Sequence, residues 1–507
     1  MKNYRKDGGT VMKLMYKSTR NSDHKVMASQ AILQGLSSDG GLYVPETIPQ
    51  LTKSMDELAK MDYPMLAYEV MKLYFTDYTE EELKNCINHA YDDKFDTPDI
   101  APIKAIGDSY YLELFHGATI AFKDMALSIL PHLLTTAAKK NNVEEDIVIL
   151  TATSGDTGKA ALSGFADVHG TKIIVFYPKN GVSSVQRKQM VTQKGSNTMV
   201  IGIEGNFDDA QTGVKAIFNN KNLAQQMKEG GYRFSSANSI NIGRLIPQVV
   251  YYVYAYANLY KNNKIQKGEK INFVVPTGNF GNILAAYYAK GMGLPINKLI
   301  CASNENKVLY DFFETGRYDK NRGFVLTSSP SMDILVSSNL ERLIYQIAGC
   351  DSTVTRELME SLSSEGVYEI SDSMKDKLVD FIGGWANGKE TKEAIHRVYN
   401  EDKYVLDTHT AVATSVYNNY VKKTGDETKT VIISTASPYK FTDSVLDAIQ
   451  SDDVPADDYD QALILKTLSG VDLPKAVEEI HYAPVLHKTT CETNEMEYII
   501  KKYLKII

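Results

Sequence analysis

Short apolar runs rich in β-branched residues alternate with longer amphipathic segments from about residue 146 onward. The apolar runs are typical of strands in a parallel sheet, and the amphipathic segments are typical of helices. We expect strands at 146–151, 171–177, 198–203, 270–276, 298–302 and 430–434. We expect helices between them, including 159–168, 184–194, 207–228, 244–261 and 282–292. Such alternation predicts an α/β fold, in which helices cover a parallel sheet.

The pattern changes at both ends of this α/β region. Residues 1–100 alternate charged and apolar positions at helical spacing, which predicts a mainly helical N-terminal domain. The core is expected over 101–445, with a smaller α/β subdomain over about 127–234 and a helical insertion over about 310–400. An acidic stretch beyond the last strand predicts a linker, so 446–507 is expected to form a C-terminal extension.

Composition and charge narrow the classes of partner. The 507 residues carry a net charge of −8, which argues against a general nucleic-acid binder. The most apolar helix-like stretch, 245–260, contains Gln248 and Asn258 and is too short to span a bilayer. The four cysteines are scattered without CxxC spacing, so we expect neither a zinc site nor a disulfide framework. The first residues are too polar for a signal peptide, and we expect a cytoplasmic protein with no metal.

Lys123 lies between an apolar stretch and a predicted helix start, in the run Phe122-Lys123-Asp124. Partial burial and the positive end of a helix dipole both disfavour a charged ammonium there. A lysine shifted toward the neutral amine can form a Schiff base with a carbonyl compound. The alternative is a lysine with a packed stem and a solvated head, and this run taken alone favours that alternative.

Two glycine-containing turns follow predicted strands and precede predicted helices. The first is 151–158, Thr-Ala-Thr-Ser-Gly-Asp-Thr-Gly, and the second is 274–282, Val-Val-Pro-Thr-Gly-Asn-Phe-Gly-Asn. Each puts free backbone amides at a helix N-terminus and at the carboxyl end of a parallel strand, where anions and ligands bind. Thr153 and Ala160 depart from the P-loop pattern, and neither turn has GxGxxG spacing. The alternative is two ordinary strand-to-helix turns.

A third candidate site is the segment 236–244, Ser-Ala-Asn-Ser-Ile-Asn-Ile-Gly-Arg. It contains amide and hydroxyl donors and ends in Arg244 at a predicted helix start. A guanidinium group suits a carboxylate or a phosphate, because its planar donors match two oxygens at once. Asparagine and serine are also ordinary helix-start residues, so this signal is weak by itself.

Together these elements resemble the fold-type II pyridoxal-phosphate enzymes, and more narrowly the threonine synthase family. The Phe-Lys-Asp element at Lys123 and the two glycine turns carry the first resemblance. Four further segments are similar to threonine synthases, namely 16–20, 40–45, 329–339 and 407–411. The resemblance extends from about residue 12 to the C-terminus and implies a tryptophan synthase β-like fold. It also implies that the smaller subdomain moves, because water must be excluded at one step and admitted at another.

The resemblance implies that pyridoxal 5'-phosphate is the cofactor. Lys123 would bind it as a Schiff base and then move protons, and Thr435 would face the pyridine nitrogen. A neutral hydroxyl there leaves the ring a weaker electron sink than an aspartate would. The residues implied to bind the cofactor's phosphate through their backbone are Gly278, Asn279, Phe280, Gly281 and Asn282.

The resemblance also implies a set of substrate-binding residues. Ser154, Asp156 and Thr157 would contact the substrate carboxylate and the cofactor's phenolic oxygen. Asn238, Ser239 and Arg244 would bind the substrate's own phosphate. After Thr435 the chain has Ser437 where the family commonly has histidine. His116 and His409 are further candidates, for which structural hydrogen bonds are at least as good an explanation.

The implied substrate is O-phosphohomoserine, converted with water to L-threonine and phosphate by γ-elimination and β-addition. A second hypothesis is a phospho-lyase or dehydratase that uses the same cofactor and releases 2-ketobutyrate, ammonia and phosphate. A third is a non-catalytic ligand-binding protein on the same scaffold. We expect a small-molecule substrate, no nucleic-acid or membrane partner, and a monomer or homodimer.

Overall fold

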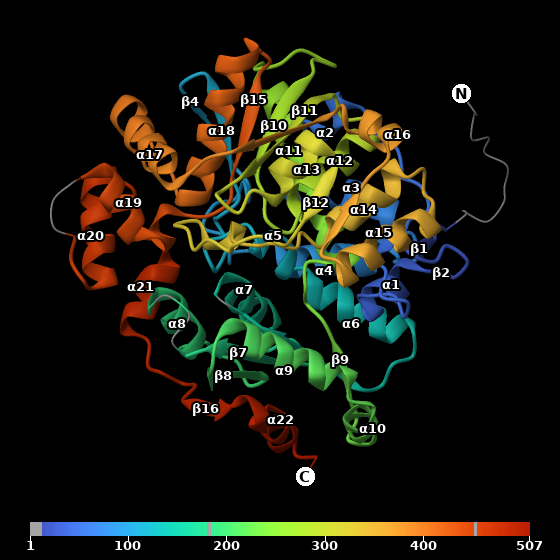
Figure 1. Ribbon diagram of the computed structural model, residues 1–507. Helices are drawn as coiled ribbons and strands as arrows, with labels where there is room; N and C mark the ends of the chain where they lie inside the picture. Colours follow the sequence, from blue (N-terminus) through green and yellow to red (C-terminus); the bar gives the residue numbers. More distant parts are fainter. Residues whose placement is uncertain (1–12, 154, 180–181, 183, 451–453, 507) are drawn as a thin grey trace.

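The chain forms two open, mainly parallel sheets in two lobes, and helices cover both faces of each sheet (Figure 1). The computed structural model describes residues 13–153, 155–179, 182, 184–450 and 454–506. The α/β fold with parallel sheets, predicted from the alternation of apolar and amphipathic segments, is confirmed.

The larger sheet has six strands, of which only the edge strand β4 is antiparallel to its neighbour. In sheet order they are β14 (Phe381–Trp385), β11 (Ile296–Ser303), β10 (Ile271–Pro276), β15 (Thr430–Ser434), β5 (Ser109–Glu113) and β4 (Ile103–Ile106). Phe273 and Val275 of β10 belong to the core with α11 (Ile242–Lys261) and α12 (Gly281–Gly291). Val274 faces the core with α18 (Thr408–Thr424). Burial on both faces explains the continuous apolar run.

The smaller sheet has five parallel strands and forms the lower lobe in Figure 1. In sheet order they are β16 (Thr489–Glu492), β8 (Thr198–Glu204), β7 (Thr171–Pro178), β6 (Asp146–Ala152) and β9 (Tyr232–Ser235). The helices α9 (Phe207–Asn219), α10 (Lys221–Glu229) and α22 (Met496–Leu504) cover one face. The helix α7 (Asp156–Phe165) packs on the other face, so both sides of this sheet are buried.

All six predicted strands are present, with ends within two residues of those expected. The predicted helices are also present, among them α8 (Ser184–Val191), but the helix expected over 207–228 is two helices, α9 and α10. The break lies at Asn220, whose side-chain oxygen accepts a hydrogen bond from the Leu223 amide at 3.1 Å. This cap begins α10 and therefore ends the continuous helix that the spacing predicted.

The N-terminal region mixes strands and helices, so the prediction of a mainly helical segment is wrong in this respect. β1 (Tyr16–Ser18), β2 (Lys25–Val26) and β3 (Tyr43–Pro45) form an antiparallel sheet in the order β2-β1-β3. The helices there are α1 (Ala28–Gln34), α2 (Met55–Leu58), α3 (Tyr63–Tyr74) and α4 (Glu80–Ala90). Strands of two or three residues carry no visible alternation of period two, so the hydrophobic pattern could not reveal them.

The segment 310–400, expected to be helical, contributes a strand to the larger sheet. This strand is β14, in which Gly383 and Gly384 remove the apolar side chains that would have indicated it. The other elements of this part of the chain are α13 (Val308–Thr315), β12 (Arg317–Asp319), α14 (Leu340–Ile347), α15 (Ser352–Ser364), β13 (Val367–Glu369), α16 (Asp372–Lys375) and α17 (Gly388–Asp402). The division of the chain at residues 100 and 445 stays a prediction.

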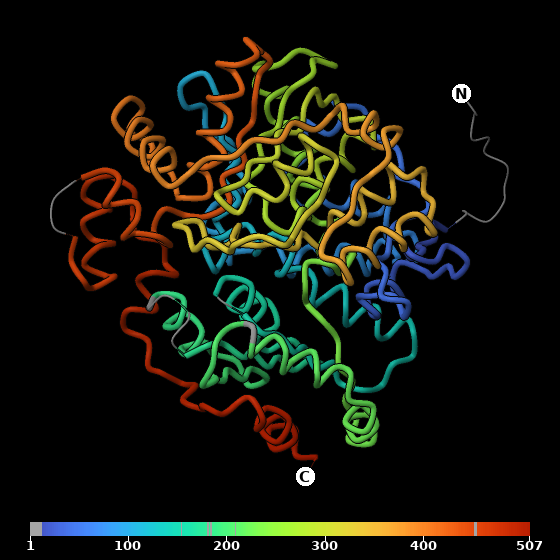
Figure 2. Tube along the Cα trace, in the orientation of Figure 1, coloured from blue at the N-terminus to red at the C-terminus, as the bar shows by residue number. Residues whose placement is uncertain are grey.

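The C-terminal part of the chain connects the two lobes. Figure 2 shows the red trace leave α19 (Thr442–Ile449) beside the larger sheet and run down to the smaller lobe. It passes through α20 (Asp458–Ser469) and α21 (Lys475–Tyr482) before β16 pairs with the edge strand β8. None of the helices in the described part of the chain is long and apolar enough to cross a membrane.

The packing of α22 predicts how strongly this C-terminal part stabilises the smaller lobe. Ile500 is 0% exposed and lies in the core with Ile201 of β8. Ile500→Ala should lower the free energy of unfolding of the smaller lobe by about 2–5 kcal/mol, because the shorter side chain leaves a cavity. Hydrogen exchange of the β8 amides measures the change. Tyr498→Ala is the matched control, since Tyr498 is 58% exposed on the same helix. Equal exchange in the two variants would show that α22 does not hold this sheet.

Candidate active site

The candidate active site lies where the carboxyl ends of strands from both sheets meet. β6 of the smaller sheet leads to Asp156 at the start of α7, and β15 of the larger sheet leads to Thr435. Lys123 precedes the short helix α5 (Asp124–Leu127), and the isolated bridge between Ala121 and Ala436 fixes its segment beside Thr435. The sequence-predicted residues Lys123, Asp156 and Thr435 are therefore brought to one place.

Lys123 is largely buried and forms polar contacts inside this site. Its Nζ lies 3.2 Å from Ser331 Oγ and 3.5 Å from Asp156 Oδ2, and its side chain is 12% exposed. Burial lowers the pKa of Lys123, and the charges of Lys440 and Arg244 lower it further against the attraction of Asp156. A buried amine shifted toward its neutral form overturns the interpretation that the local run favoured, a lysine with a solvated head.

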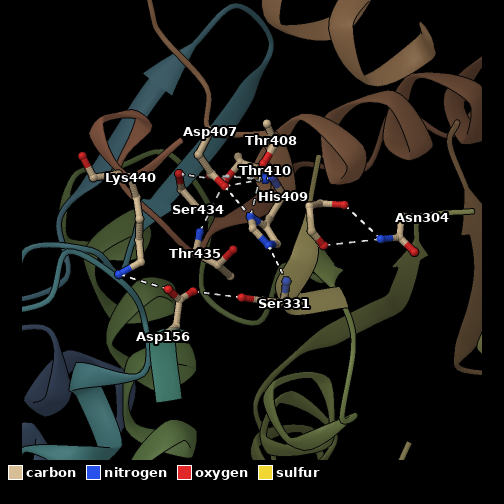
Figure 3. Close-up of polar contacts among 12 residues, drawn as sticks. Asp156, Asn304, Ser331, Asp407, Thr408, His409, Thr410, Ser434, Thr435 and Lys440 are labelled. Carbon is tan, nitrogen blue, oxygen red and sulfur yellow. Dashed lines mark hydrogen bonds and ion pairs between the residues drawn. The ribbon is translucent and has the colours of Figure 1, made fainter. Parts of the chain in front are cut away.

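Asp156 lies between two lysines, Lys440 and Lys123. Figure 3 shows its contacts with Lys440 and Ser331. Its Oδ1 lies 3.1 Å from Lys440 Nζ and accepts a hydrogen bond from Gln186 Nε2 at 3.0 Å. Its Oδ2 accepts a hydrogen bond from Ser331 Oγ at 2.9 Å. Burial alone would raise the pKa of Asp156, but Lys440 and Lys123 outweigh it and hold the pKa well below its usual value. Asp156 is therefore a carboxylate.

His409 positions the loop that carries Ser331. The Ser331 amide donates a hydrogen bond to His409 Nε2 at 3.1 Å, and His409 Nδ1 lies 3.0 Å from Asp407 Oδ1. Because Nε2 accepts a hydrogen bond, the ring proton is on Nδ1 and the imidazole is neutral. Asp407 is the N-cap residue of α18, and its side chain also accepts a hydrogen bond from the His409 amide at 2.8 Å. His409 therefore has the structural role that the sequence left open.

His116 has a structural role at the edge of the larger sheet. Its Nδ1 lies 2.6 Å from Asp96 Oδ1, and its Nε2 lies 3.0 Å from Glu113 Oε2. Burial by itself would lower the pKa of His116, but the two carboxylates raise it to about 9. The charged imidazole thus joins the N-terminal region to the end of β5.

The turn 278–282 has the shape of an anion cradle. The carbonyl of Gly278 accepts a bond from Ser337 Oγ at 2.6 Å, and the carbonyl of Asn279 accepts one from the Asn339 amide at 3.1 Å. Phe280 has a φ of 62°, in the left-handed region, immediately before α12 begins at Gly281. The first amides of α12 have no carbonyl partner within the helix, so they are free to bind an anion.

Asn282 shows that this cradle fits a phosphate. Its Oδ1 accepts hydrogen bonds from Tyr251 and Tyr252, both at 2.6 Å, which fixes the direction of the amide. Its Nδ2 is buried and has no hydrogen-bond partner among the described residues. A buried unpaired donor beside free helix amides needs an acceptor, and a phosphate group supplies one.

Arg244 is the second candidate anion site. It is buried at the start of α11, and its Nη1 donates to the carbonyl of Ala237 at 2.9 Å. Its Nε is buried and without a partner in the described part of the chain. Burial lowers the pKa of Arg244 to about 10, so the group stays charged at neutral pH. The guanidinium is thus available to a ligand anion near Lys123.

The other predicted substrate residues differ in how the structure places them. Ser239 Oγ accepts a bond from Asn339 Nδ2 at 3.5 Å, which joins the segment 236–244 to the cradle. Asn238 is exposed; its backbone amide donates to Ser236 Oγ at 3.2 Å, and its carbonyl accepts a bond from the Asn241 amide at 3.1 Å. Thr157 is half-buried in the first turn of α7. Ser154 lies outside the described residues.

Sequence reasoning missed two residues of the site. Ser331 lies in one of the segments that resemble threonine synthases, but no role was assigned to it. Lys440 ends the short helix η3 (Pro438–Lys440), which follows Thr435 by three residues and is capped by Ser437 Oγ. The one available signal was a lysine placed between two aromatic residues, Tyr439 and Phe441, directly after a predicted cofactor residue.

This arrangement of fold and site is that of a pyridoxal-phosphate-dependent enzyme. The family model described as "Pyridoxal-phosphate dependent enzyme" matches residues 104–436. Models described as "Threonine synthase N terminus" and "Threonine synthase, C-terminal" match residues 15–91 and 410–483. The chain belongs to the threonine synthase family, and the predicted cofactor is confirmed as that of the family.

Individual relatives agree with this assignment. The chain is 38% identical over 510 residues to human "Threonine synthase-like 1", covering 97% of this chain and 66% of that protein. It thus spans just under two thirds of the length of that relative. It is 36% identical over 466 residues to threonine synthase of Saccharomyces cerevisiae, covering 86% of this chain and 89% of that protein.

Two solved structures are similar over almost the whole chain. The structure of pyridoxal-phosphate-bound threonine synthase from Brucella melitensis superimposes with a TM-score of 0.83 at 34% identity. The yeast threonine synthase structure has a TM-score of 0.87 at 32% identity. Each comparison covers 97% of this chain and 99% of the other.

The close packing of the cradle against the Ser331 loop predicts a steric test. A Cβ added at Gly278 would lie 2.8 Å from the carbonyl oxygen of Ser331. Gly278→Ala should therefore displace this loop and weaken cofactor binding by about tenfold or more, which is about 1.4 kcal/mol. Titration of cofactor-free protein with pyridoxal 5'-phosphate measures the change. Gly323→Ala is the control, because its Cβ would meet no atom within 4 Å. Unchanged affinity in Gly278→Ala would show that the cofactor's phosphate binds at another place.

Proposed function

We propose that the protein is a threonine synthase, which converts O-phospho-L-homoserine and water to L-threonine and phosphate. The observation that carries this proposal is the buried Arg244, whose Nε has no partner among the described residues. The cradle at Gly278–Asn282 accounts for the phosphate of the cofactor. A second buried cation beside Lys123 calls for a second anion, and O-phosphohomoserine brings one.

The charges around Lys123 support a substrate with two anionic groups. Lys123, Lys440 and Arg244 are cations or potential cations, and Asp156 is the carboxylate that faces the two lysines. A buried site with excess positive charge is stabilised by anions, since opposite charges compensate each other at low dielectric. A substrate with a carboxylate and a phosphate meets this need better than serine or threonine, which have no phosphate.

In the proposed reaction, different residues of this chain have different roles. Pyridoxal 5'-phosphate, when bound, supplies the carbonyl that reacts with the substrate amine and draws electrons from its Cα. Lys123, directed by Ser331 Oγ and Asp156, is placed to take a proton from the substrate and return it at another carbon. Arg244 binds the phosphate that receives the electron pair of the Cγ–O bond. Protons are lost from Cα and then from Cβ as the Cγ–O bond breaks, and Cγ gains a proton to become the methyl group. Water adds its hydroxyl at Cβ, Cα regains a proton, and the remaining proton goes to the phosphate.

The product of the reaction separates the proposal from the phospho-lyase hypothesis. Incubation with O-phosphohomoserine should yield threonine and phosphate in equal amounts, with little 2-ketobutyrate. Lys123→Ala should abolish turnover and the visible absorption of the cofactor while the far-ultraviolet circular dichroism stays unchanged. 2-Ketobutyrate as the main product would establish the phospho-lyase instead. A protein without visible cofactor absorption, unaffected by Lys123→Ala, would be a non-catalytic binding protein.

The role of Arg244 has its own test. Arg244→Ala should lower kcat/KM for O-phosphohomoserine by about 2–5 kcal/mol of transition-state binding, because a desolvated charge partner of the phosphate is lost. Arg233→Ala serves as the control, since Arg233 is an exposed residue of β9. Cofactor absorption should be retained in both variants. Unchanged kinetics in Arg244→Ala would place the substrate phosphate at another site.

A further inference from the structure

Lys440 is a fully buried ammonium with three acceptors. Its side chain is 0% exposed, and its Nζ lies 3.1 Å from Asp156 Oδ1. It also donates to the carbonyl of Thr119 at 3.0 Å and to Gln189 Oε1 at 3.4 Å. An ammonium group has three N–H donors and no acceptor, so these three contacts satisfy it completely in its charged form.

Lys123 is the less well satisfied of the two lysines that share Asp156. Its hydrogen bond runs to a neutral hydroxyl, Ser331 Oγ at 3.2 Å, and its distance to Asp156 Oδ2 is 3.5 Å. One carboxylate cannot fully stabilise two ammonium groups in a buried site, because the like charges repel each other. Lys123 is therefore the lysine whose ammonium form is less well stabilised by its contacts.

We propose that Lys440 is a positioning residue, which takes the carboxylate of Asp156 as its own partner and thereby leaves the amine of Lys123 uncharged and free to bind the cofactor. The inference rests on the proposed function only in that Lys123 is the residue that binds the cofactor. Lys440 acts through Asp156 and, by this proposal, touches neither the substrate nor the cofactor.

The other charged groups around the two lysines agree with this assignment. The charge of Arg244, from α11, lowers the pKa of Lys123, as the charge of Lys440 does. Asp124, from α5, is buried and accepts two bonds from Thr119, at 2.7 Å through the backbone amide and 2.6 Å through the hydroxyl. Lys159 and Asp124 also lie within electrostatic range of Lys440. His409, from α18, is the neutral tautomer described above and adds no full charge.

A short stretch of backbone connects Lys440 to the predicted cofactor site. Lys440 and Thr435 belong to one short segment, in which the Lys440 amide donates to the carbonyl of Ser437 at 3.0 Å. The carbonyl of Thr435 in turn accepts a bond from the Phe122 amide at 2.8 Å, directly before Lys123. Thr435 is predicted to face the cofactor ring, and Lys440 is the counter-charge of Asp156. Both therefore lie on one segment that is hydrogen-bonded to the backbone next to Lys123.

The test is the reactivity of the Lys123 amine in cofactor-free protein. Lys440→Met removes the ammonium, so Asp156 should pair with Lys123 and keep it protonated to higher pH. Acetylation by acetic anhydride across the alkaline range, followed by mass spectrometry of the Lys123 peptide, reports the fraction of free amine. At about pH 8, acetylation should slow by about tenfold or more, the effect of a rise of one unit in the pKa of Lys123. Recovery of the cofactor's visible absorption on reconstitution should slow in parallel.

Three variants keep the proposal open to refutation. Lys440→Arg retains the positive charge and should restore most of the reactivity. Lys159→Met is the matched control, because the Lys159 amine bonds Gln193 Oε1 at 2.5 Å and not Asp156. Asp156→Asn should have the opposite effect, faster acetylation of Lys123, and it provides the test if Lys440→Met does not fold.

An unchanged acetylation profile in a folded Lys440→Met protein overturns the proposal, as does slower acetylation in Asp156→Asn. The measurement needs no substrate. If the protein makes 2-ketobutyrate in place of threonine, the proposed function fails while the acetylation result still decides the role of Lys440.

Discussion

The ionised carboxylate of Asp156 is the interaction on which the site depends. Asp156 begins a helix of the smaller lobe, while three of its partners, Lys440, Ser331 and Lys123, come from segments attached to the larger sheet. A buried charge is costly unless it is paired and hydrogen-bonded, and this one has a partner on each oxygen. The charge of Asp156 therefore links the two lobes at the site and acts directly on Lys123.

Much of this structure could be predicted from local patterns. The strands of both sheets are buried on two faces, so they appear in the sequence as continuous apolar runs, and the glycine turns follow them directly. Lys123 and Asp156 could be named because each lies in such a turn or in a short motif, and Thr435 could be named because the family resemblance implied it. The short strands β1, β2 and β3 could not, since two or three residues show no alternation and are stabilised by tertiary pairing.

The missed residues were missed for a different physical reason. Lys440 is 284 residues from Asp156 in the chain, and its function comes from a contact that only the tertiary fold creates. A lysine between two aromatic residues carries no sign of burial in its neighbours, because the same pattern occurs at surfaces where the lysine stem packs and the head is solvated. The same limitation applies to β16, in which Thr489 pairs with Ile201 of β8, 288 residues earlier in the chain.

The chemistry of the contacts also explains how one site can hold and release anions. The contacts of Asp156 with Lys440, Ser331 and Lys123 are polar, and such bonds can be exchanged for bonds to a ligand at modest net cost. Arg244 Nε and Asn282 Nδ2 have unmet hydrogen-bonding capacity among the described residues, which favours binding of phosphate groups at two separate points. In the proposed reaction the phosphate that leaves the substrate would stay paired with the Arg244 guanidinium, so its charge would not have to be solvated by water. The buried cations would then serve both specificity and the bond-breaking step.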